Sequence, residues 1–258
     1  MSGRRARRVA PAQTGRAKLP VMHAMGRTDT GRVRAENQDV FAVRDDLGLA
    51  VVADGVARPR AGRVAAEVAV DITVEYLAGI KRCRRLRDHD LRKAMETAND
   101  RAFGLSCAIS AYRGMASTLV VTALDGAKGY VAHVGDSRAY RFRKGVLSGL
   151  TKDHNVVQRW VDAGVMSVEQ ARLDPERHVV TRAIGAERTL RPEIQELDIL
   201  PRDLLLLCSD GLTEHLDDAE IARHLATVED LGEGADRLVD AANDAGGSDN
   251  VTVVLIRC

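Results

Sequence analysis

The sequence contains few aromatic residues and no closely spaced cysteines. Only 3% of its 258 residues are Phe, Trp or Tyr, although 45% are apolar, so a core must be built from Val, Leu, Ile and Ala. The four cysteines lie far apart and form no Cys-x-x-Cys pair. This spacing argues against a zinc site and a disulfide framework, and it favours reduced thiols in a cytoplasmic protein.

Long apolar runs are missing as well. No stretch approaches the ~20 residues that a membrane-spanning helix needs, and the start of the chain lacks the apolar stretch of a secretory signal. Residues 1–20 instead contain six Arg or Lys and no acid. We expect residues 1–20 to form a disordered basic tail and residues 21–258 to form one catalytic domain.

The rest of the chain lacks an excess of basic charge. Without the tail, 32 basic and 37 acidic residues leave a net charge of −5. A mildly acidic domain argues against a nucleic-acid-binding face as its main role.

Runs of predicted strands alternate with runs of predicted helices, without a regular βαβ rhythm. This order indicates an α+β fold with antiparallel sheets. Three strands at 117–124, 128–134 and 138–143 are separated by Asp-Gly and Gly-Asp turns, which predicts a meander. The other predicted strands are 39–44, 48–53, 203–209 and 251–257, and the predicted helices are 61–77, 90–112, 156–163, 168–172, 217–225 and 229–242.

Five aspartates stand beside small residues at the ends of predicted strands. They are Asp39, Asp54, Asp136, Asp210 and Asp249. Each one alone is typical of a plain turn, but five such strand ends that meet at one sheet edge would gather their carboxylates. Clustered carboxylates repel one another unless cations neutralise them. The pattern therefore predicts a site for Mg²⁺, Mn²⁺ or Ca²⁺ and leaves the reaction open.

Six motifs in order carry a resemblance to a known family. They are TDTGRVRAENQD (28–39), VADG (52–55), GMASTL (114–119), AHVGDSRAY (132–140), LCSDGL (207–212) and GSDNVT (247–252). Over residues 26–256 the chain resembles the metal-dependent protein phosphatases of type 2C in their bacterial form.

The resemblance implies a four-layer αββα sandwich, with two antiparallel sheets flanked by helices around a metal centre. It implies a serine/threonine phosphatase that hydrolyses phosphoserine and phosphothreonine by attack of a water bridging two metal ions. Two or three manganese or magnesium ions would be the cofactors. The partner would be a phosphoprotein, the substrate of a bacterial serine/threonine kinase, and the enzyme would be a cytoplasmic monomer.

The same resemblance assigns roles to individual residues. Asp54 would bridge two ions, with the Gly55 carbonyl completing the second, and Asp39 would act through bound water. Arg34 would grip the phosphate, because its planar fork suits two phosphate oxygens. The catalytic set is thus Arg34, Asp39 and Asp54, and the metal set is Asp39, Asp54, Gly55, Asp136, Asp210 and Asp249, with Asp136 and Asp210 holding a third ion.

Three departures from the family pattern concern the surroundings of the metals. The loop at residues 56–60 reads Val-Ala-Arg-Pro-Arg where bacterial relatives usually have Met-Gly-Gly-His, so it is stiffer and more basic. Val56 stands where some eukaryotic relatives have a histidine acid. Gln38 replaces a common Glu. We expect these changes to affect metal affinity and rate more than the type of reaction.

Residues 151–189 resemble the family's flap, a long excursion of the kind that often selects substrates. We refer to them as the flap segment. Within it we interpret His154 and His178 as surface residues, with substrate contact as the alternative. His133, inside a strand pattern, is interpreted as structural.

Two other functions remain open from the sequence. A catalytically weak phosphoprotein-binding module on the same fold would explain the altered loop at 56–60. An unrelated two-metal phosphoesterase would act on nucleotides or other small phosphate esters, although the acidic balance disfavours a nucleic-acid substrate.

Overall fold

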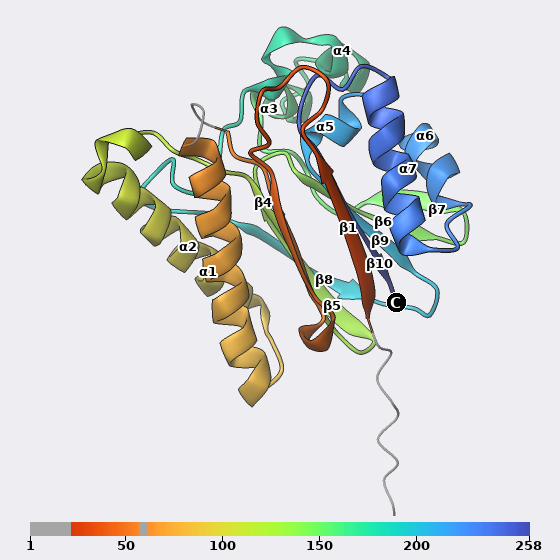
Figure 1. The fold of residues 1–258 in the computed structure, drawn as a ribbon, viewed down its shortest axis with the longest axis horizontal. Helices are drawn as coiled ribbons and strands as arrows, with labels where there is room; N and C mark the ends of the chain where they lie inside the picture. The colour runs from red at the N-terminus through yellow and green to blue at the C-terminus, as the bar shows by residue number, and fades with distance from the viewer. Residues whose placement is uncertain (1–21, 57–60) are drawn as a thin grey trace, which may run out of the picture.

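The computed structural model describes residues 22–56 and 61–258 (Figure 1). The expectations for the basic tail at residues 1–20 and for the altered loop at 57–60 lie outside the described residues.

Two five-stranded antiparallel sheets form the centre of the molecule. The first has the order β1 (His23–Asp29), β10 (Val251–Arg257), β9 (Leu204–Cys208), β6 (Arg138–Arg143) and β7 (Val146–Gly149). The second has the order β2 (Val40–Arg44), β3 (Leu49–Ala53), β4 (Leu119–Asp125), β5 (Lys128–Val134) and β8 (Glu193–Asp198).

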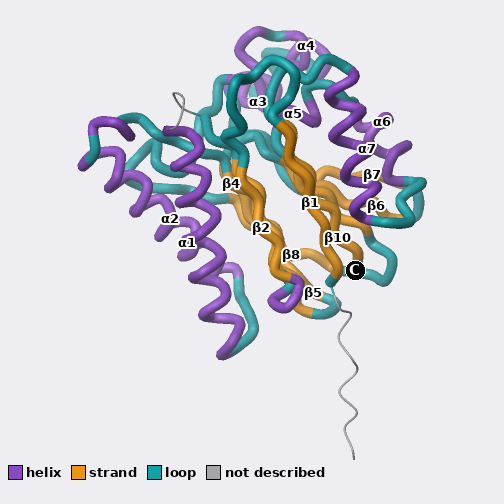
Figure 2. The backbone as a smooth tube through the Cα atoms, in the orientation of Figure 1, coloured by secondary structure: helices purple, strands orange, loops and turns teal. Residues whose placement is uncertain are grey.

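Helices cover the outer face of each sheet, as Figure 2 shows. The long pair α1 (Ala61–Cys83) and α2 (Asp88–Ala108) lies on the second sheet, and α6 (Asp218–Leu225) and α7 (Leu231–Asp244) lie on the first. The short helices α3 (Val156–Asp162), α4 (Val168–Leu173) and α5 (Asp210–Thr213) gather at one end of the sandwich. The predicted αββα sandwich is confirmed.

The strand periodicity explains the layers. Along β3, Ala50 and Val52 face the other sheet, where they share an apolar cluster with Leu205 and Leu207. The alternate residues of the strand belong to the cluster under α1. Because both faces are buried, the strand reads as an unbroken apolar run rather than an alternating one.

The predicted meander is wrong in its third strand. Of the three predicted strands, β4 and β5 form a hairpin, whereas β6 crosses to the first sheet, where it pairs with β9 and β7. The far edge of β5 is occupied by β8 instead. Gly135, with φ of 99°, makes the turn after β5, and an added Cβ there would lie 2.6 Å from the Thr118 side chain. The crossing therefore places Asp136 between the two sheets' ends.

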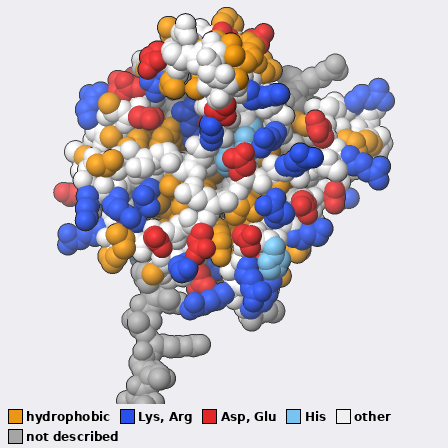
Figure 3. Space-filling model, turned by 180° about the vertical axis from the view of Figure 1, so that it is seen from behind, with side chains coloured by type: hydrophobic (Ala, Val, Ile, Leu, Met, Phe, Trp, Pro, Cys, Tyr) orange, Lys and Arg blue, Asp and Glu red, His pale blue; other side chains and the backbone are white. Residues whose placement is uncertain are grey.

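The face of the described residues drawn in Figure 3 mixes basic, acidic and apolar side chains. Among the helices of residues 22–56 and 61–258, none is long and apolar enough to cross a membrane.

Candidate metal centre

All five predicted aspartates lie at the same end of the sandwich. Asp54 and Asp136 follow β3 and β5, which run parallel to each other within the second sheet. Asp39 precedes β2, which is antiparallel to β3 and so begins where β3 ends. In the first sheet, Asp210 follows β9 and Asp249 precedes its antiparallel neighbour β10. Two strand starts and three strand ends thus lie at the same end of the sandwich.

The pKa of Asp54 shows how closely the carboxylates approach. Burial raises this pKa well above its usual value of 3.8, and the charges of Asp39, Asp210, Asp136 and Asp249 raise it further. Burial is also the main cause that raises the pKa of Asp210 to about 7. Like charges in a desolvated site favour protonation or a bound cation. The predicted gathering of the aspartates is therefore observed.

The Asp39 side chain is held through one of its carboxylate oxygens, and the other accepts no hydrogen bond from a described residue. Its side chain is buried, and its Oδ2 atom accepts hydrogen bonds from Ser209 Oγ at 2.7 Å and Thr252 Oγ1 at 2.6 Å. These bonds lower the pKa of Asp39, but burial outweighs them and raises it to about 7. Its Oδ1 atom accepts no hydrogen bond from a described residue, and the same is true of Oδ1 of Asp136 and Asp210. Buried carboxylate oxygens that lack a hydrogen-bond donor are suitable ligands for hard divalent cations.

Asp54 and Gly55 are fixed through their backbone. The Asp54 carbonyl oxygen accepts the Thr118 N–H at 2.8 Å and the Ser117 hydroxyl at 2.9 Å. Thr118 Oγ1 in turn accepts the Asp54 N–H at 3.0 Å. A Cβ on Gly55 would lie 2.3 Å from the Gly62 carbonyl carbon, so only glycine lets this strand end meet the first turn of α1.

Arg34 lies at the mouth of the site. Its guanidinium Nη2 donates to Asp249 Oδ2 at 2.5 Å, and 56% of its side chain is exposed. Together with Asp54, Gly55 and Asp210 it lines a groove of about 820 Å³. The guanidinium and the carboxylates therefore face the same groove.

The flap segment is hydrogen-bonded near both of its ends to residues that lie beside the aspartates. His154 N–H donates to the Gly135 carbonyl at 2.9 Å, next to Asp136. At the other end, Ile184 exchanges backbone hydrogen bonds with Ser117. Between these points run α3, α4 and the 3-10 helix η3 (Pro175–His178). The segment is therefore held by hydrogen bonds near both ends, and it lines the edge of the groove that contains Arg34.

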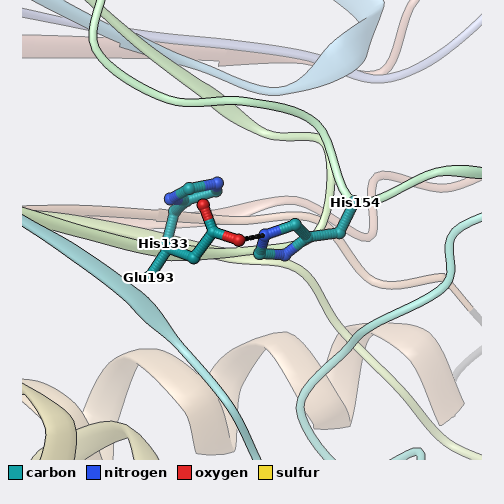
Figure 4. A group of neighbouring side chains, drawn as sticks. All are labelled: His133, His154 and Glu193. Atoms are coloured by element: carbon teal, nitrogen blue, oxygen red, sulfur yellow. Dashed lines mark ion pairs between the residues drawn. The ribbon is translucent and has the colours of Figure 1, made fainter. Parts of the chain in front are cut away.

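The interpretation of His154 as a surface residue is wrong. Its side chain is buried and stacks on His133, with ring centroids 4.6 Å apart. Its Nδ1 atom accepts the Gly135 N–H at 3.2 Å, and Nε2 lies 3.1 Å from Glu193 Oε1 (Figure 4). Burial lowers the pKa of His154 to about 4. His133 is buried too, with Nε2 2.8 Å from the Lys152 carbonyl oxygen, whereas His178 is exposed as expected.

Comparison with known proteins identifies the family. A profile described as protein phosphatase 2C matches residues 30–243 of the chain. The chain belongs to the protein phosphatase 2C family. The family predicted from the six motifs is therefore confirmed.

Several relatives of this 2C-type chain carry functional names. The serine/threonine phosphatase stp of Listeria monocytogenes is 35% identical over 240 residues, covering 91% of this chain and 95% of the relative. The solved Mycobacterium tuberculosis serine/threonine phosphatase PstP/Ppp superposes with a TM-score of 0.84 at 32% identity, covering 92% of this chain and 98% of the other. The catalytic domain of PstP in complex with two manganese ions gives 0.81 at 31% identity, covering 92% and 98%.

The sequence reasoning missed several side chains around the aspartates of this 2C-type site. Ser209 and Thr252 hold Asp39, and Asn250 ties the loops together by donating to the carbonyl oxygens of Thr30 and Glu36. Glu214, whose pKa is raised by burial, was also missed. Its position in the sequence could have predicted it, because a residue four positions after Asp210 projects from the same side of a helix.

Proposed function

We propose that this chain is a metal-dependent protein phosphatase that hydrolyses phosphoserine and phosphothreonine side chains. The observation that carries the proposal is the set of buried aspartates with unbonded oxygens at one end of the sandwich. Membership of the 2C family and the serine/threonine phosphatase names of the relatives support it.

The proposed metal ligands are the residues that the resemblance assigned. Asp54 would hold two of the ions, the Gly55 carbonyl would complete the ligands of the second, and Asp136 would share a third ion with Asp210. The ions are manganese or magnesium, in keeping with the all-oxygen donors. When bound, they would activate water and offset the negative charge of the phosphoryl group. The full ligand set is Asp39, Asp54, Gly55, Asp136, Asp210 and Asp249.

Arg34 would bind the phosphoryl oxygens of the substrate. In the described structure its guanidinium is paired with Asp249, so substrate phosphate would compete with that carboxylate for the same donors. A cation bound to Asp249 would weaken this pair and leave the Arg34 guanidinium available for the phosphoryl oxygens.

The wider setting is part of the same proposal. Residues 21–258 would act as one catalytic unit, with residues 151–189 as its flap. The substrate would be a protein phosphorylated by a bacterial serine/threonine kinase, and the enzyme would work as a monomer in the cytoplasm.

Hydrolysis of a phosphothreonine peptide tests the reaction directly. We expect phosphate release with Mn²⁺, none with EDTA, and a loss of at least about 100-fold in Asp210→Asn, because one ligand is shared by two sites. Asp100→Asn, which changes an exposed acid on α2, is the matched control and should keep full activity.

The same assay separates the alternatives. Release from a small ester such as a nucleoside monophosphate, but from no phosphopeptide, would favour the phosphoesterase hypothesis. Tight phosphopeptide binding without release, by a protein that still binds Mn²⁺, would favour the phosphoprotein-binding module.

A further inference from the structure

A half-buried histidine after α5 contacts the loop that carries Asp249. His215 follows Glu214, the C-cap of α5, and its Nε2 atom accepts the Ser248 N–H at 2.9 Å. Ser248 immediately precedes Asp249 in the sequence. An N–H can donate only to an unprotonated ring nitrogen, so the ring proton lies on Nδ1 in this arrangement. The imidazole therefore holds the backbone one residue before a proposed metal ligand.

The hydroxyl of the same serine provides a second contact with the end of α5. Ser248 Oγ lies 2.9 Å from His215 Nε2, but the backbone N–H already occupies the lone pair of that nitrogen. The hydroxyl can rotate, and it donates to Glu214 Oε2 at 3.4 Å. Of the two donors of Ser248, the backbone N–H thus makes the shorter bond, and its acceptor is His215.

The imidazole also packs against the loop. Gly246 has a φ of 142°, and a Cβ there would lie 3.0 Å from Cε1 of His215. The carbonyl oxygen of the next residue, Gly247, accepts the Arg32 N–H at 2.7 Å. The loop is therefore bonded both to the end of α5 and to the segment that carries Arg34.

The bond between His215 and Ser248 joins the segments that carry two of the aspartates. Asp210 is the first residue of α5, and Asp249 follows Ser248. Burial first, and then the charges of Glu214 and Asp249, raise the pKa of Asp210 to about 7. Repulsion between these carboxylates favours separation of the two segments when no cation neutralises them. The bond to His215 opposes this separation and keeps Asp249 beside Asp210.

The loop that carries Asp136 is held in the same way. There His154, whose ring Figure 4 shows, accepts the Gly135 N–H through Nδ1 at 3.2 Å, and Gly135 immediately precedes Asp136. In both loops a ring nitrogen accepts the backbone N–H of the residue before an aspartate. His154 is buried in the core, whereas His215 is half-buried at the end of a short helix. His215 can therefore be replaced with less damage to the fold.

We propose that His215 is a positioning residue, which sets the place of Asp249 by accepting the Ser248 N–H and so strengthens the binding of the divalent cation. The inference rests on the proposed function only in taking Asp249 as a metal ligand. His215 acts through the backbone of Ser248 and is not itself a ligand of the ion. Groups that orient a metal ligand typically change metal affinity about 10- to 100-fold when they are removed.

Isothermal titration calorimetry with Mn²⁺ tests this role by exchanging the acceptor. We expect His215→Leu to bind Mn²⁺ about 10- to 100-fold more weakly than the wild type. His215→Gln should recover most of the affinity, because its side-chain oxygen can take the place of Nε2 and accept the same N–H. His23→Leu is the matched control and should bind as the wild type does. His23 is exposed at the start of β1, where it pairs with the far end of β10.

The Asp249→Ala variant tests whether His215 acts through Asp249. In that background His215→Leu should cause no further loss of Mn²⁺ affinity, because the position of a missing carboxylate has no effect. Ser248→Ala keeps the backbone N–H and should stay close to the wild type. Equal losses from His215→Leu with and without Asp249, or equal losses from His215→Leu and His215→Gln, would overturn the positioning role.

Hydrogen exchange of the Ser248 amide in EDTA detects the contact without metal or activity. We expect protection in the wild type and in His215→Gln, and faster exchange in His215→Leu, while the amides of α7 keep their protection and show that the fold is intact. Equal exchange in the wild type and His215→Leu would overturn the inference. A wild type that binds no Mn²⁺ would overturn the proposed metal centre and this role together, whereas equally tight binding by the wild type and His215→Leu would overturn this role alone.

Discussion

At the scale of single residues, the hydroxyls around Asp39 orient a carboxylate that has one unbonded oxygen. Thr252 and Ser209 both donate to Oδ2, which directs Oδ1 toward the other aspartates. Groups that orient a ligand in this way typically change metal affinity about 10- to 100-fold when they are removed. We therefore expect Thr252→Val to weaken Mn²⁺ binding by about that factor, as measured by isothermal titration calorimetry.

Thr122→Val is the matched control for this prediction. Thr122 is also a fully buried strand threonine, but its hydroxyl makes no hydrogen bond to a described residue. Its replacement should leave Mn²⁺ affinity unchanged and should not reduce stability. Equal Mn²⁺ affinity in Thr252→Val and Thr122→Val would show that the hydroxyl does not orient Asp39.

At the scale of elements, the contact of β3 with the first turn of α1 depends on Gly55. A methyl group there would lie 2.3 Å from the Gly62 backbone, which cannot rotate away as a flexible side chain can. Overpacking of this kind typically costs about 1–3 kcal/mol. We expect Gly55→Ala to lower the free energy of unfolding by about this amount in urea denaturation with EDTA present.

Gly79→Ala provides the comparison within α1 itself. Nothing lies within 4 Å of a Cβ at Gly79, and helical Ala is about 0.5–1 kcal/mol more stable than Gly. The control should therefore gain stability. A Gly55→Ala protein as stable as the wild type would mean that the strand end and the helix are not held in this contact.

The attachment of the flap segment to β5 should depend on pH through His154. Its pKa of about 4 lies below its ordinary 6.5, so the unfolded chain binds the proton more readily. The stabilising contribution is complete above pH 6.5 and is lost as the pH falls toward 4. The groups that face the imidazole are His133, Arg182 and Glu193, of which Glu193 alone favours the charged form.

We expect urea denaturation to show that the free energy of unfolding of the wild type falls by about 2 kcal/mol between pH 7 and pH 5. The His154→Phe variant should not show this fall. The aspartate cluster contributes equally to both proteins, so the difference between them isolates the imidazole. Parallel pH profiles of the two proteins would contradict the burial of a neutral His154.

How far the elements could be predicted depends on their place in the sheets. Central strands such as β3, β9 and β10 are unbroken apolar runs and were predicted almost to the residue. The missed strands β1, β7 and β8 all lie at sheet edges. Edge strands carry polar and charged residues that keep them from pairing with other chains, and this hides the alternation that marks a strand.

In the metal centre, too, some side-chain positions could be predicted from the sequence and others could not. The predicted aspartates came together because each stands at the end of a strand, and strand direction fixes which ends meet. The burial of His154 could not be predicted, because this loop residue packs against His133 of β5 and Glu193 of β8, which lie far from it in the sequence. The passage of β6 into the other sheet likewise depends on which partner strand is available, and periodicity does not encode this.

At the scale of the whole molecule, the two sheets meet at a site lined by five aspartates. Burial raises the pKa of Asp39 and of Asp210 to about 7, and it raises the pKa of Asp136 well above its usual value. Without metal, the folded protein therefore takes up protons that the unfolded chain, with pKa values of about 4, releases. The resulting stabilisation is complete below about pH 4 and is lost as the pH rises through about 7.

The melting temperature in EDTA should accordingly fall as the pH is raised from about 5.5 to about 8, and saturating Mn²⁺ should reverse this trend. The reversal arises because Mn²⁺ binds the deprotonated carboxylates, so its stabilisation grows as the protons leave. Asp210→Asn removes one of the titrating groups and should flatten both curves, whereas Asp100→Asn should flatten neither. If the EDTA curve rose with pH as steeply as the Mn²⁺ curve, Asp39, Asp136 and Asp210 could not be buried together as the strand ends place them, because their burial, and after it their mutual repulsion, requires the opposite slope.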